Sequence, residues 1–233
     1  MSRRKVKKPF VVRCLRALSI ILAAALLASV LLVVPLRWLE PPTTAFMLGD
    51  ASGRDPVLYE WTGWPGLGSS AALAVVAAED QKFAEHAGFD LESIQESVMQ
   101  HREGAGLRGA STITQQVAKN LYLWPGRSFL RKGIEAWFAL LIELSWPKRR
   151  ILETYLNIAE FGPGLYGVPA ASRVYFGKPA SEISDAEAAL LAAVLPNPHR
   201  LDAARPSPYV RERQRWILRH MQRLRREGWL QTL

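Results

Sequence analysis

Residues 109–121 read Gly-Ala-Ser-Thr-Ile-Thr-Gln-Gln-Val-Ala-Lys-Asn-Leu, a stretch typical of a helix that begins at a polar residue. Ile113, Val117 and Leu121 recur every four residues, so they share the face of the helix that should pack on a core. Ser111 is the residue that we expect to cap the helix. The stretch therefore predicts a capped amphipathic helix inside a helical domain.

A second face of the same helix carries Gln116 and Lys119, one turn apart. A lysine in that position offers a point charge for phosphate, and the free N–H groups at a helix N-terminus also favour anions. An ordinary solvated face would show the same spacing. The choice between a phosphate site and a plain surface therefore depends on other segments.

Helical patterns continue on both sides of this stretch, and no internal repeat appears. No run alternates convincingly at period two, so the pattern predicts an all-α fold class. The other expected helices are 69–79 capped by Ser69 or Ser70, a segment capped by Asp90, 129–145, 148–159, a segment that the Ser184–Glu187 capping box opens and Pro196 ends, and 209–226.

The formal net charge of +9 comes from the two ends of the chain. Seven basic residues and no acids lie in residues 1–16, and eight arginines lie in residues 205–226. Residues 17–204 carry fifteen basic and nineteen acidic side chains. No basic face of a domain is indicated, so nucleic acid is not an expected partner. The C-terminal arginines suit either anionic lipid headgroups or a solvated helix face.

Residues 17–36 are twenty uncharged residues rich in Leu, Ala, Val and Ile. At 1.5 Å per residue they would cross a hydrocarbon core of about 30 Å. The basic residues before them should stay in the cytoplasm, so the rest of the chain should be exported. A cleaved signal peptide is the alternative, but the run is long for one and ends in Val-Val-Pro-Leu-Arg-Trp, without an A-x-A-like site. We expect a retained single-pass anchor.

The expected organisation has four parts: a basic tail (1–16), the anchor (17–36), a Pro- and Gly-rich connector (37–68) and a helical domain (69–233). The only cysteine is Cys14, in the tail. The exported part is therefore expected to have neither a disulfide nor a Cys-based zinc site.

Glu79 ends an apolar helix and opens the segment Glu-Asp-Gln-Lys-Phe-Ala-Glu-His-Ala-Gly. A carboxylate that emerges from an apolar helix can have its pKa raised by desolvation, which suits a general base near neutral pH. A helix end that turns into solvent is the alternative interpretation. His86, taken alone, is more typical of a structural histidine than of a catalytic one.

A cationic cluster comes later in the chain, where Arg127, Arg131 and Lys132 precede Glu135 by at most two turns. Cations beside an acid are what an anionic leaving group requires. A wet helix face can carry the same charges, so this segment alone does not decide the function.

Taken together and in order, these segments resemble the monofunctional peptidoglycan glycosyltransferases, relatives of the glycosyltransferase domain of class A penicillin-binding proteins. The resemblance covers about residues 45–226. Its motifs are Glu-Asp-x-x-Phe-x-x-His-x-Gly at 79–88, Gly-Ala-Ser-Thr-Ile-Thr-Gln-Gln at 109–116, Arg-Lys-x-x-Glu at 131–135, Tyr-Leu-Asn-Ile-Ala-Glu-Phe-Gly at 155–162 and Ala-Ala-Ser-Arg-Val-Tyr-Phe-Gly-Lys at 170–178.

The resemblance implies a lysozyme-like glycosyltransferase domain and an inverting transfer. Glu79 would take the proton from the 4-hydroxyl of the acceptor N-acetylglucosamine in lipid II. That oxygen would attack C1 of N-acetylmuramic acid on the growing glycan strand, forming a β-1,4 linkage and expelling undecaprenyl pyrophosphate. Glu135 would be the second catalytic glutamate and would orient the cations. The pyrophosphate would bind to Gln116, Lys119, Arg127 and Arg131. The cleft would be shaped by Asp80, Phe83, His86, Ser111 and Thr112.

The resemblance also implies a place in the bacterial inner membrane, with the domain in the periplasm. Expected partners are lipid II, the growing glycan strand, membrane lipid, and cell-wall synthesis or division proteins. No cofactor or metal site is expected, with stimulation by a divalent cation left open. Apolar residues near the substrate motifs suit either core packing, which is expected for most of them, or entry into the outer leaflet to receive the lipid tail. They are Leu107, Leu123, Trp124, Trp137, Phe138 and Trp146.

Ser145 and Lys148 match the Ser-x-x-Lys of penicillin-binding transpeptidases. No Lys-Thr-Gly partner follows, and the chain after Lys178 is too short for a transpeptidase domain, so no cross-linking activity is expected. Two alternatives stay open at this point. One is a lysozyme-like enzyme that cleaves glycan, which would need a general acid for its neutral leaving alcohol. The other is a non-catalytic membrane-anchored scaffold.

Overall fold

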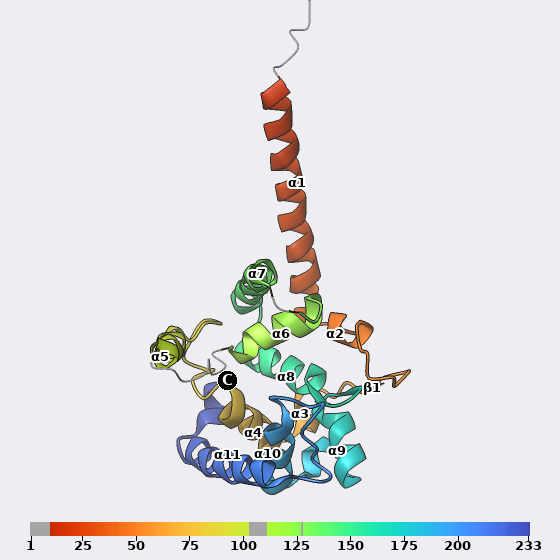
Figure 1. Ribbon diagram of the computed structural model, residues 1–233, viewed down its shortest axis with the longest axis vertical. Coiled ribbons are helices and arrows are strands. Elements are labelled where there is room, and N and C mark those ends of the chain that lie inside the picture. The colour runs from red at the N-terminus through yellow and green to blue at the C-terminus, as the bar shows by residue number, and fades with distance from the viewer. Residues whose placement is uncertain (1–9, 103–110, 127) are drawn as a thin grey trace, which may run out of the picture.

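The computed structural model describes residues 10–102, 111–126 and 128–233, and helices dominate it. A long N-terminal helix, α1 (Phe10–Val33), stands on a helical domain (Figure 1). This architecture confirms the all-α class. In chain order the domain contains η1 (Val34–Arg37), α2 (Ala45–Leu48), β1 (Leu58–Tyr59), α3 (Trp64–Leu67), α4 (Ser69–Glu79), α5 (Leu91–Arg102), α6 (Ile113–Tyr122), α7 (Phe129–Ser145), α8 (Lys148–Ile158), β2 (Glu160–Gly162), β3 (Leu165–Tyr166), α9 (Val168–Phe176), η2 (Ala180–Glu182), α10 (Asp185–Val194), α11 (Pro208–Arg226) and η3 (Trp229–Thr232).

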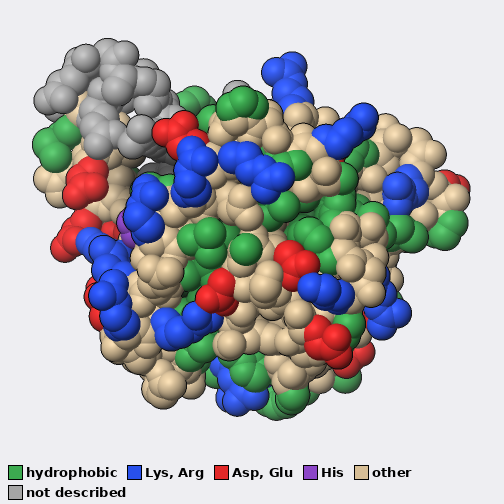
Figure 2. Space-filling view, turned by 90° about the horizontal axis from the view of Figure 1, so that it is seen from below, with side chains coloured by type: hydrophobic (Ala, Val, Ile, Leu, Met, Phe, Trp, Pro, Cys, Tyr) green, Lys and Arg blue, Asp and Glu red, His purple; other side chains and the backbone are tan. Residues whose placement is uncertain are grey.

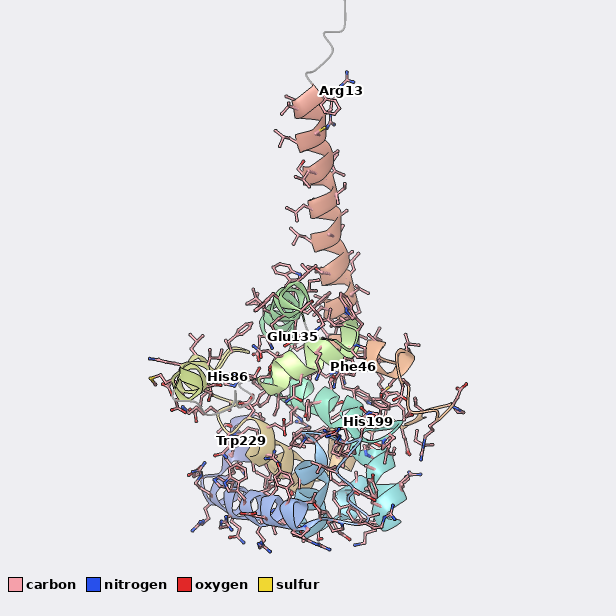
Figure 3. All side chains as sticks on the ribbon, viewed as in Figure 1. Arg13, Phe46, His86, Glu135, His199 and Trp229 are labelled. Carbon is pink, nitrogen blue, oxygen red and sulfur yellow. The ribbon has the colours of Figure 1, made fainter. Side chains whose placement is uncertain are left out.

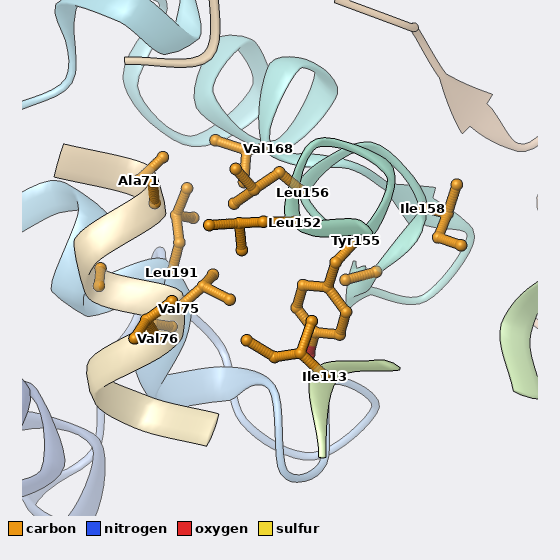
Figure 4. Packing of buried hydrophobic residues seen from close by; sticks show 14 of the residues in the cluster. Ala71, Val75, Val76, Ile113, Leu152, Tyr155, Leu156, Ile158, Val168 and Leu191 are labelled. Carbon is orange, nitrogen blue, oxygen red and sulfur yellow. The ribbon is translucent and has the colours of Figure 1, made fainter. Parts of the chain in front are cut away.

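The core is built around α4, in which every residue from Ala71 to Ala77 is buried. A helix that is apolar on all sides must be covered on all sides, and α8, α10 and α11 pack against it. Figure 4 shows Leu152 of α8 and Leu191 of α10 close to Val75 of α4. Burying one such side chain contributes roughly 1.5–3 kcal/mol, so this packing fixes the end of α4, where Glu79 lies.

A small sheet includes part of the stretch that was expected to be a connector. Leu58 of β1 pairs in parallel with Leu165 of β3, and β2 pairs antiparallel with β3. Nearby, Asn157 accepts a hydrogen bond from the Thr62 N–H at 2.8 Å and donates one to the Thr62 carbonyl at 3.0 Å. These contacts join the end of the connector to the domain. The strands have only two or three residues, too few for an alternation to show in the sequence.

Two of the predicted helix caps are wrong. Gly68, whose φ of +76° suits glycine, precedes α4, and the hydroxyl of Ser70 donates to Asp185 Oδ1 at 2.7 Å instead of capping. Thr112, not Ser111, caps α6 by accepting a backbone N–H of its first turn. Ser111 is free to contact a side chain of α7 because it lies one residue outside the cap.

Other local predictions are confirmed. Asp90 accepts the N–H of Ser93 at the start of α5, and Ser184 and Glu187 form the predicted capping box of α10. The predicted stripe of α6 is fully or nearly buried, and so is the stripe of α11. The buried residues are Ile113, Val117, Leu121, Val210, Ile217, Met221 and Leu224.

The N-terminal helical segment Phe10–Arg37 has 28 residues and is long and apolar enough to cross a membrane. It contacts the domain mainly through α7. Trp137 Nε1 donates to Ser29 Oγ at 3.1 Å, and Trp146 Nε1 donates to the Val33 carbonyl at 3.0 Å. The last turns of α1 and the helix α7 are therefore tied side by side.

The basic helix α11 lies at the end of the domain farthest from α1 (Figure 1). Figure 2, seen from below, shows many Lys and Arg side chains on this face, with acids among them. The C-terminal arginines are thus turned away from the membrane that α1 would cross. Seven of the eight arginines are exposed, which favours the solvated face over contact with the lipid headgroups around α1, whereas Arg213 is only partly exposed and turns toward the core.

Candidate active site

Glu79 is the last residue of α4, and its side chain is 15 % exposed. Its Oε2 accepts a hydrogen bond from Gln116 Nε2 at 2.9 Å, and its Oε1 lies 3.5 Å from Arg213 Nη2. Burial raises the pKa of the Glu79 carboxyl above its ordinary value of 4.5, whereas the Gln116 hydrogen bond and the charges of Arg213 and Lys119 act to lower it. A carboxylate in these surroundings can serve as a general base near neutral pH.

Gln116 is held from its other side by Tyr155 of α8. The Tyr155 hydroxyl donates to Gln116 Oε1 at 3.1 Å, so the amide turns its N–H toward Glu79. Figure 4 shows the Tyr155 ring reaching from α8 toward Ile113 at the start of α6. Burial raises the pKa of Tyr155 well above its ordinary value, so the hydroxyl stays a donor. Gln116 was expected to bind pyrophosphate, but its side-chain amide donates to the Glu79 carboxylate in this structure.

Asp80 ties the end of α4 to the start of α6. Its Oδ2 accepts the N–H of Ile113 at 3.0 Å, and its Oδ1 lies 2.9 Å from His86 Nε2. A carboxylate at the first turn of a helix is stabilised by the partial positive charge there. Asp80 and the Thr112 hydroxyl therefore accept two of the backbone N–H groups at the start of α6, those of Ile113 and Gln115. These groups were expected to be free for phosphate.

Phe83 is fully buried, so it supports the cleft from below and offers no surface to a ligand. Its ring centroid lies 6.4 Å from those of His86 and Trp229. The ammonium of Lys148 lies over the Phe83 ring at 4.5 Å, donates to the His86 carbonyl at 2.6 Å and pairs with Glu143 at 2.8 Å. These contacts fix the turn between α4 and α5.

Glu135 lies on α7, and its side chain is 3 % exposed. Arg131, one turn earlier, donates to Glu135 Oε2 at 2.9 Å, and Lys132 Nζ contacts Glu135 Oε1. Lys132 also reaches across to α6, where it lies 3.3 Å from Ser111 Oγ and 3.5 Å from Gln115 Oε1. A buried carboxylate between two cations holds both of them in place.

Lys119 of α6 interacts electrostatically with both glutamates, Glu79 and Glu135. Burial lowers its pKa, and the nearby cations of α7 act in the same direction. Its Nζ lies 5.1 Å from the centre of the Phe46 ring. An ammonium that is removed from water in this way would interact more strongly with a bound anion than an exposed one.

Two cavities adjoin the pair formed by Glu79 and Gln116. One has a volume of about 360 Å³ and includes Glu79. The other has a volume of about 450 Å³ and includes Gln116 and Lys119. In Figure 3, Phe46 and His199 mark residues that line the larger cavity, and Glu135 lies just below the base of α1.

The structure brings together most of the predicted site residues in two groups. Asp80, Gln116 and, through Asp80, His86 surround Glu79, and Ser111 and Arg131 belong to the group around Glu135. Lys119 interacts electrostatically with the glutamates of both groups. Arg127 lies outside the described residues.

Sequence reasoning gave no role to Tyr155 or Arg213, the residues that hold Gln116 and Glu79 from the far side. Tyr155 opens one of the motifs quoted above, so its place in that motif was a signal. Arg213 could have been found from its place in the apolar stripe of the last helix, between Val210 and Ile217.

Comparison with known proteins places the chain in one family. Residues 58–222 match the transglycosylase family. A biosynthetic peptidoglycan transglycosylase from Aeromonas hydrophila is 50 % identical over 216 residues, 91 % of this chain and 92 % of the relative. Proteins of the same name from Pseudomonas aeruginosa and Xanthomonas campestris are 51 % and 49 % identical over 88 % and 94 % of this chain, and the matches cover 91 % and 94 % of those relatives. The chain therefore belongs to the transglycosylase family.

Proposed function

We propose that the protein polymerises the glycan strands of peptidoglycan from lipid II, as an inverting glycosyltransferase. The observation that carries the proposal is the position of the cationic group of Arg131 and Lys132. The group lies on α7, which packs beside α1, the helix long and apolar enough to cross a membrane. Lys119 interacts electrostatically with both Glu135 of this group and Glu79. A substrate whose sugar is joined to a lipid by pyrophosphate needs a base for the sugar hydroxyl and cations for the pyrophosphate near the membrane. Glu79 and the cations of α7 would supply these.

In the proposed reaction Glu79 takes the proton from the 4-hydroxyl of the acceptor N-acetylglucosamine. The oxygen forms a bond to C1 of N-acetylmuramic acid as the bond from C1 to the pyrophosphate oxygen breaks. Displacement from the opposite face inverts C1 and forms the β-1,4 linkage, and undecaprenyl pyrophosphate leaves as an anion. Because cations can stabilise that anion, the leaving group needs no general acid.

The cations available for the pyrophosphate are Lys119, Arg131 and Lys132. Glu135 holds the last two, and burial strengthens the field of Lys119. Arg127 remains a proposed member of this group. A glycan-cleaving enzyme has no pyrophosphate to bind, so this cluster favours transfer over the lysozyme-like alternative.

The anchor supports a lipid-linked substrate. If residues 17–36 fill a hydrocarbon core of about 30 Å, Ser29 lies roughly 10 Å inside its outer boundary. Trp137 contacts Ser29, so α7 reaches into the outer leaflet in this arrangement. Leu140 and Leu144 on α7 are also exposed, as expected of a lipid-facing helix. We infer an inner-membrane protein with its domain in the periplasm.

The two cavities beside Glu79 and Gln116 offer room for two substrates, an acceptor and a growing strand. Glu79 lines one cavity and its hydrogen-bond partner Gln116 lines the other, so an acceptor in the first cavity would place its hydroxyl at the base. Cross-linking is not part of the proposed activity. Ser145 Oγ donates to the Leu141 carbonyl, and the Lys148 ammonium is bound to Glu143 and His86, so neither serves the other as a nucleophile and base would.

The proposal is tested by incubating the purified full chain in detergent with labelled lipid II and separating the products by gel electrophoresis. We expect a ladder of glycan polymers that a muramidase digests. Glu79→Gln should lower the rate by about 10²–10⁴-fold, the usual contribution of a general base, without loss of the fold. Glu212→Gln, an exposed glutamate on α11, is the matched control and should keep the rate of the wild type.

Three outcomes would contradict the proposal. Wild-type protein that shortens preformed glycan and makes no polymer would support the cleaving enzyme. No reaction in either assay would support the scaffold. Polymerisation at an unchanged rate by Glu79→Gln would remove Glu79 as the base. A parallel reaction with a chelator tests the proposal that no metal is required, and the rate should persist in it.

A further inference from the structure

The C-terminal helix α11 places one arginine in its apolar stripe. Arg213 lies three residues after Val210 and four before Ile217, so it shares the face of the helix that packs on the core. Its side chain is 23 % exposed, against 50 % for Arg223 and 46 % for Arg225 on the same helix. Burial of a charge costs free energy unless a partner compensates, so this position calls for an explanation.

The partner of Arg213 is the end of α4. Arg213 Nη2 lies 3.5 Å from Glu79 Oε1 and 3.4 Å from the carbonyl oxygen of Ala78. Ala78 is in the last turn of α4, where carbonyl groups have no partner within the helix and a cation is favourable. One guanidinium thus contacts both the backbone that carries Glu79 and its side chain.

Arg213 Nη2 contacts α4, while Arg213 Nε is buried and has no hydrogen-bond partner among the residues that the structure describes. What the position of Arg213 does provide is a fixed positive charge and a directed N–H at one oxygen of Glu79.

The two oxygens of Glu79 are held from opposite elements. Gln116 of α6 donates to Oε2, and Arg213 of α11 approaches Oε1. We propose that Arg213 is a positioning residue for Glu79, which holds the carboxylate in a fixed orientation and keeps it ionised for proton abstraction. This inference rests on the proposed function, because it assigns Arg213 to the base of that reaction.

Several charged or titratable groups face Glu79, and they do not all act in the same direction. Asp80 on the adjoining turn raises the pKa of Glu79, as burial does, whereas Lys119 of α6 and Arg213 of α11 lower it. The hydroxyl of Tyr155 on α8 stays protonated. Lys119 is shared with Glu135, so Arg213 is the cation dedicated to Glu79.

The sign of the effect on pH dependence follows from this balance. A general base acts in its ionised form, so activity rises with pH through its pKa. Loss of the Arg213 charge raises that pKa, so the acidic limb of the rate profile moves to higher pH. An opposite charge at this distance typically changes a pKa by about one unit or more.

The test is the pH profile of lipid II polymerisation by the full chain, for wild type and Arg213→Gln. We expect the acidic limb of the kcat profile to move up by about one pH unit. Well above that limb, the rate should stay within about tenfold of wild type, because the base itself is retained. Arg213→Lys keeps the charge and should bring the limb back toward that of the wild type.

A second measurement does not depend on activity. The carboxyl of Glu79 can be titrated by carbon-13 NMR of glutamate-labelled protein in micelles, with its signal assigned by its loss in Glu79→Gln. Its midpoint should rise by about one unit in Arg213→Gln. Arg213→Met, which keeps an aliphatic stem in the stripe, replaces that variant if Arg213→Gln does not fold. Arg219→Gln, at an exposed arginine of α11, is the matched control and should leave the midpoint unchanged.

The inference would be overturned if the neutral variants left both the titration midpoint of Glu79 and the acidic limb of the rate profile unchanged. A rate that fell equally at every pH would not rescue it, because a structural role predicts that result. Failure of the proposed function looks different. In that case the wild type makes no polymer, while the NMR titration still measures the effect of Arg213 on Glu79.

Discussion

Glu79 and Glu135 both interact electrostatically with Lys119, but Glu135 is buried, Glu79 is partly exposed, and their surroundings differ. Glu79 ends a helix and receives one hydrogen bond from a neutral amide, with a guanidinium 3.5 Å away. Glu135 lies inside α7, where Arg131 and Lys132 contact its two oxygens at hydrogen-bonding distance. Glu79 thus has one neutral hydrogen-bond donor close by, whereas Glu135 has a cation on each oxygen.

The difference shows how one fold can use the same residue type for two tasks. A base needs an oxygen that can still accept a proton, so its partners must be few and partly neutral. A carboxylate that orients cations needs strong ion pairs on both oxygens. The two glutamates can be told apart by removing the negative charge of each in turn.

The largest expected effect on stability is that of Glu135→Gln. The change leaves Arg131, only 11 % exposed, without its anionic partner. Breaking a buried ion pair costs about 3 kcal/mol, which corresponds to a fall in Tm of roughly 6–12 °C for a chain of this size. Polymerisation should fall as well, because the cations lose their fixed positions. Thermal unfolding of the full chain in micelles, followed by circular dichroism, measures the first effect.

Glu79→Gln is the matched control for that measurement. A glutamine at 79 still offers an oxygen to Arg213 and removes a charge that burial disfavours, so Tm should stay within a few degrees of wild type. Equal losses of Tm in both variants would contradict the contrast between the two sites.

A smaller effect is expected for Tyr155→Phe. The change removes the hydroxyl that orients the Gln116 amide and leaves Gln116 Oε1 without that donor. A lost hydrogen bond of about 1 kcal/mol in the positioning of the base corresponds to a rate lower by about fivefold to tenfold. The lipid II polymerisation rate measures this effect, and kcat should fall more than KM rises.

Tyr175→Phe provides the comparison for Tyr155→Phe. The Tyr175 hydroxyl donates to the Phe161 carbonyl at 3.2 Å, away from Glu79, so its loss should leave kcat unchanged. If both variants reduced kcat equally, the effect of Tyr155 would be one of general packing, and the link from Tyr155 through Gln116 to Glu79 would carry no weight.

The sequence allowed the helices to be predicted because they depend on local patterns, whereas the roles expected of Glu79 and Glu135 came from the family resemblance. The stripe Ile113, Val117 and Leu121 and the capping box at Ser184 involve residues three to eight positions apart, and the structure confirms them. The caps at Ser111 and Ser70 were wrong for a physical reason. The choice between adjacent hydroxyls depends on distant partners, such as the Asp185 carboxylate that takes Ser70.

The supports of the site lay beyond local patterns. Tyr155 and Gln116 are 39 residues apart, and Glu79 and Arg213 are 134 residues apart. Only the packing of α8 and α11 against the core brings these pairs together. The same holds for Trp137 and Ser29, which join the anchor to α7 across 108 residues. The family resemblance suggested which side chains do chemistry, and residue spacing did not show which ones hold them.

The smallest expected effect is that of Ser29→Ala, which tests whether the anchor helps to hold Glu135 in place. Glu79 sits on a helix enclosed by the core, whereas Glu135 sits on a helix whose outer side is tied to α1 by the hydrogen bond from Trp137 to Ser29. Ser29→Ala removes that acceptor. Hydrogen bonds between membrane helices average about 0.6 kcal/mol, so we expect a small loss of Tm and a polymerisation rate lower by less than about threefold.

Ser19→Ala is the control, because the Ser19 hydroxyl is exposed and bonds within α1 to the Arg16 carbonyl. It should match wild type in both measurements. If Ser29→Ala also matched wild type, the anchor would act only as a tether, and the cations around Glu135 would be positioned by the domain alone. If the rate fell while Tm stayed unchanged, we would infer that the anchor places α7 correctly at the membrane. The position of Glu79 should not depend on the anchor, because α4 is enclosed by the core.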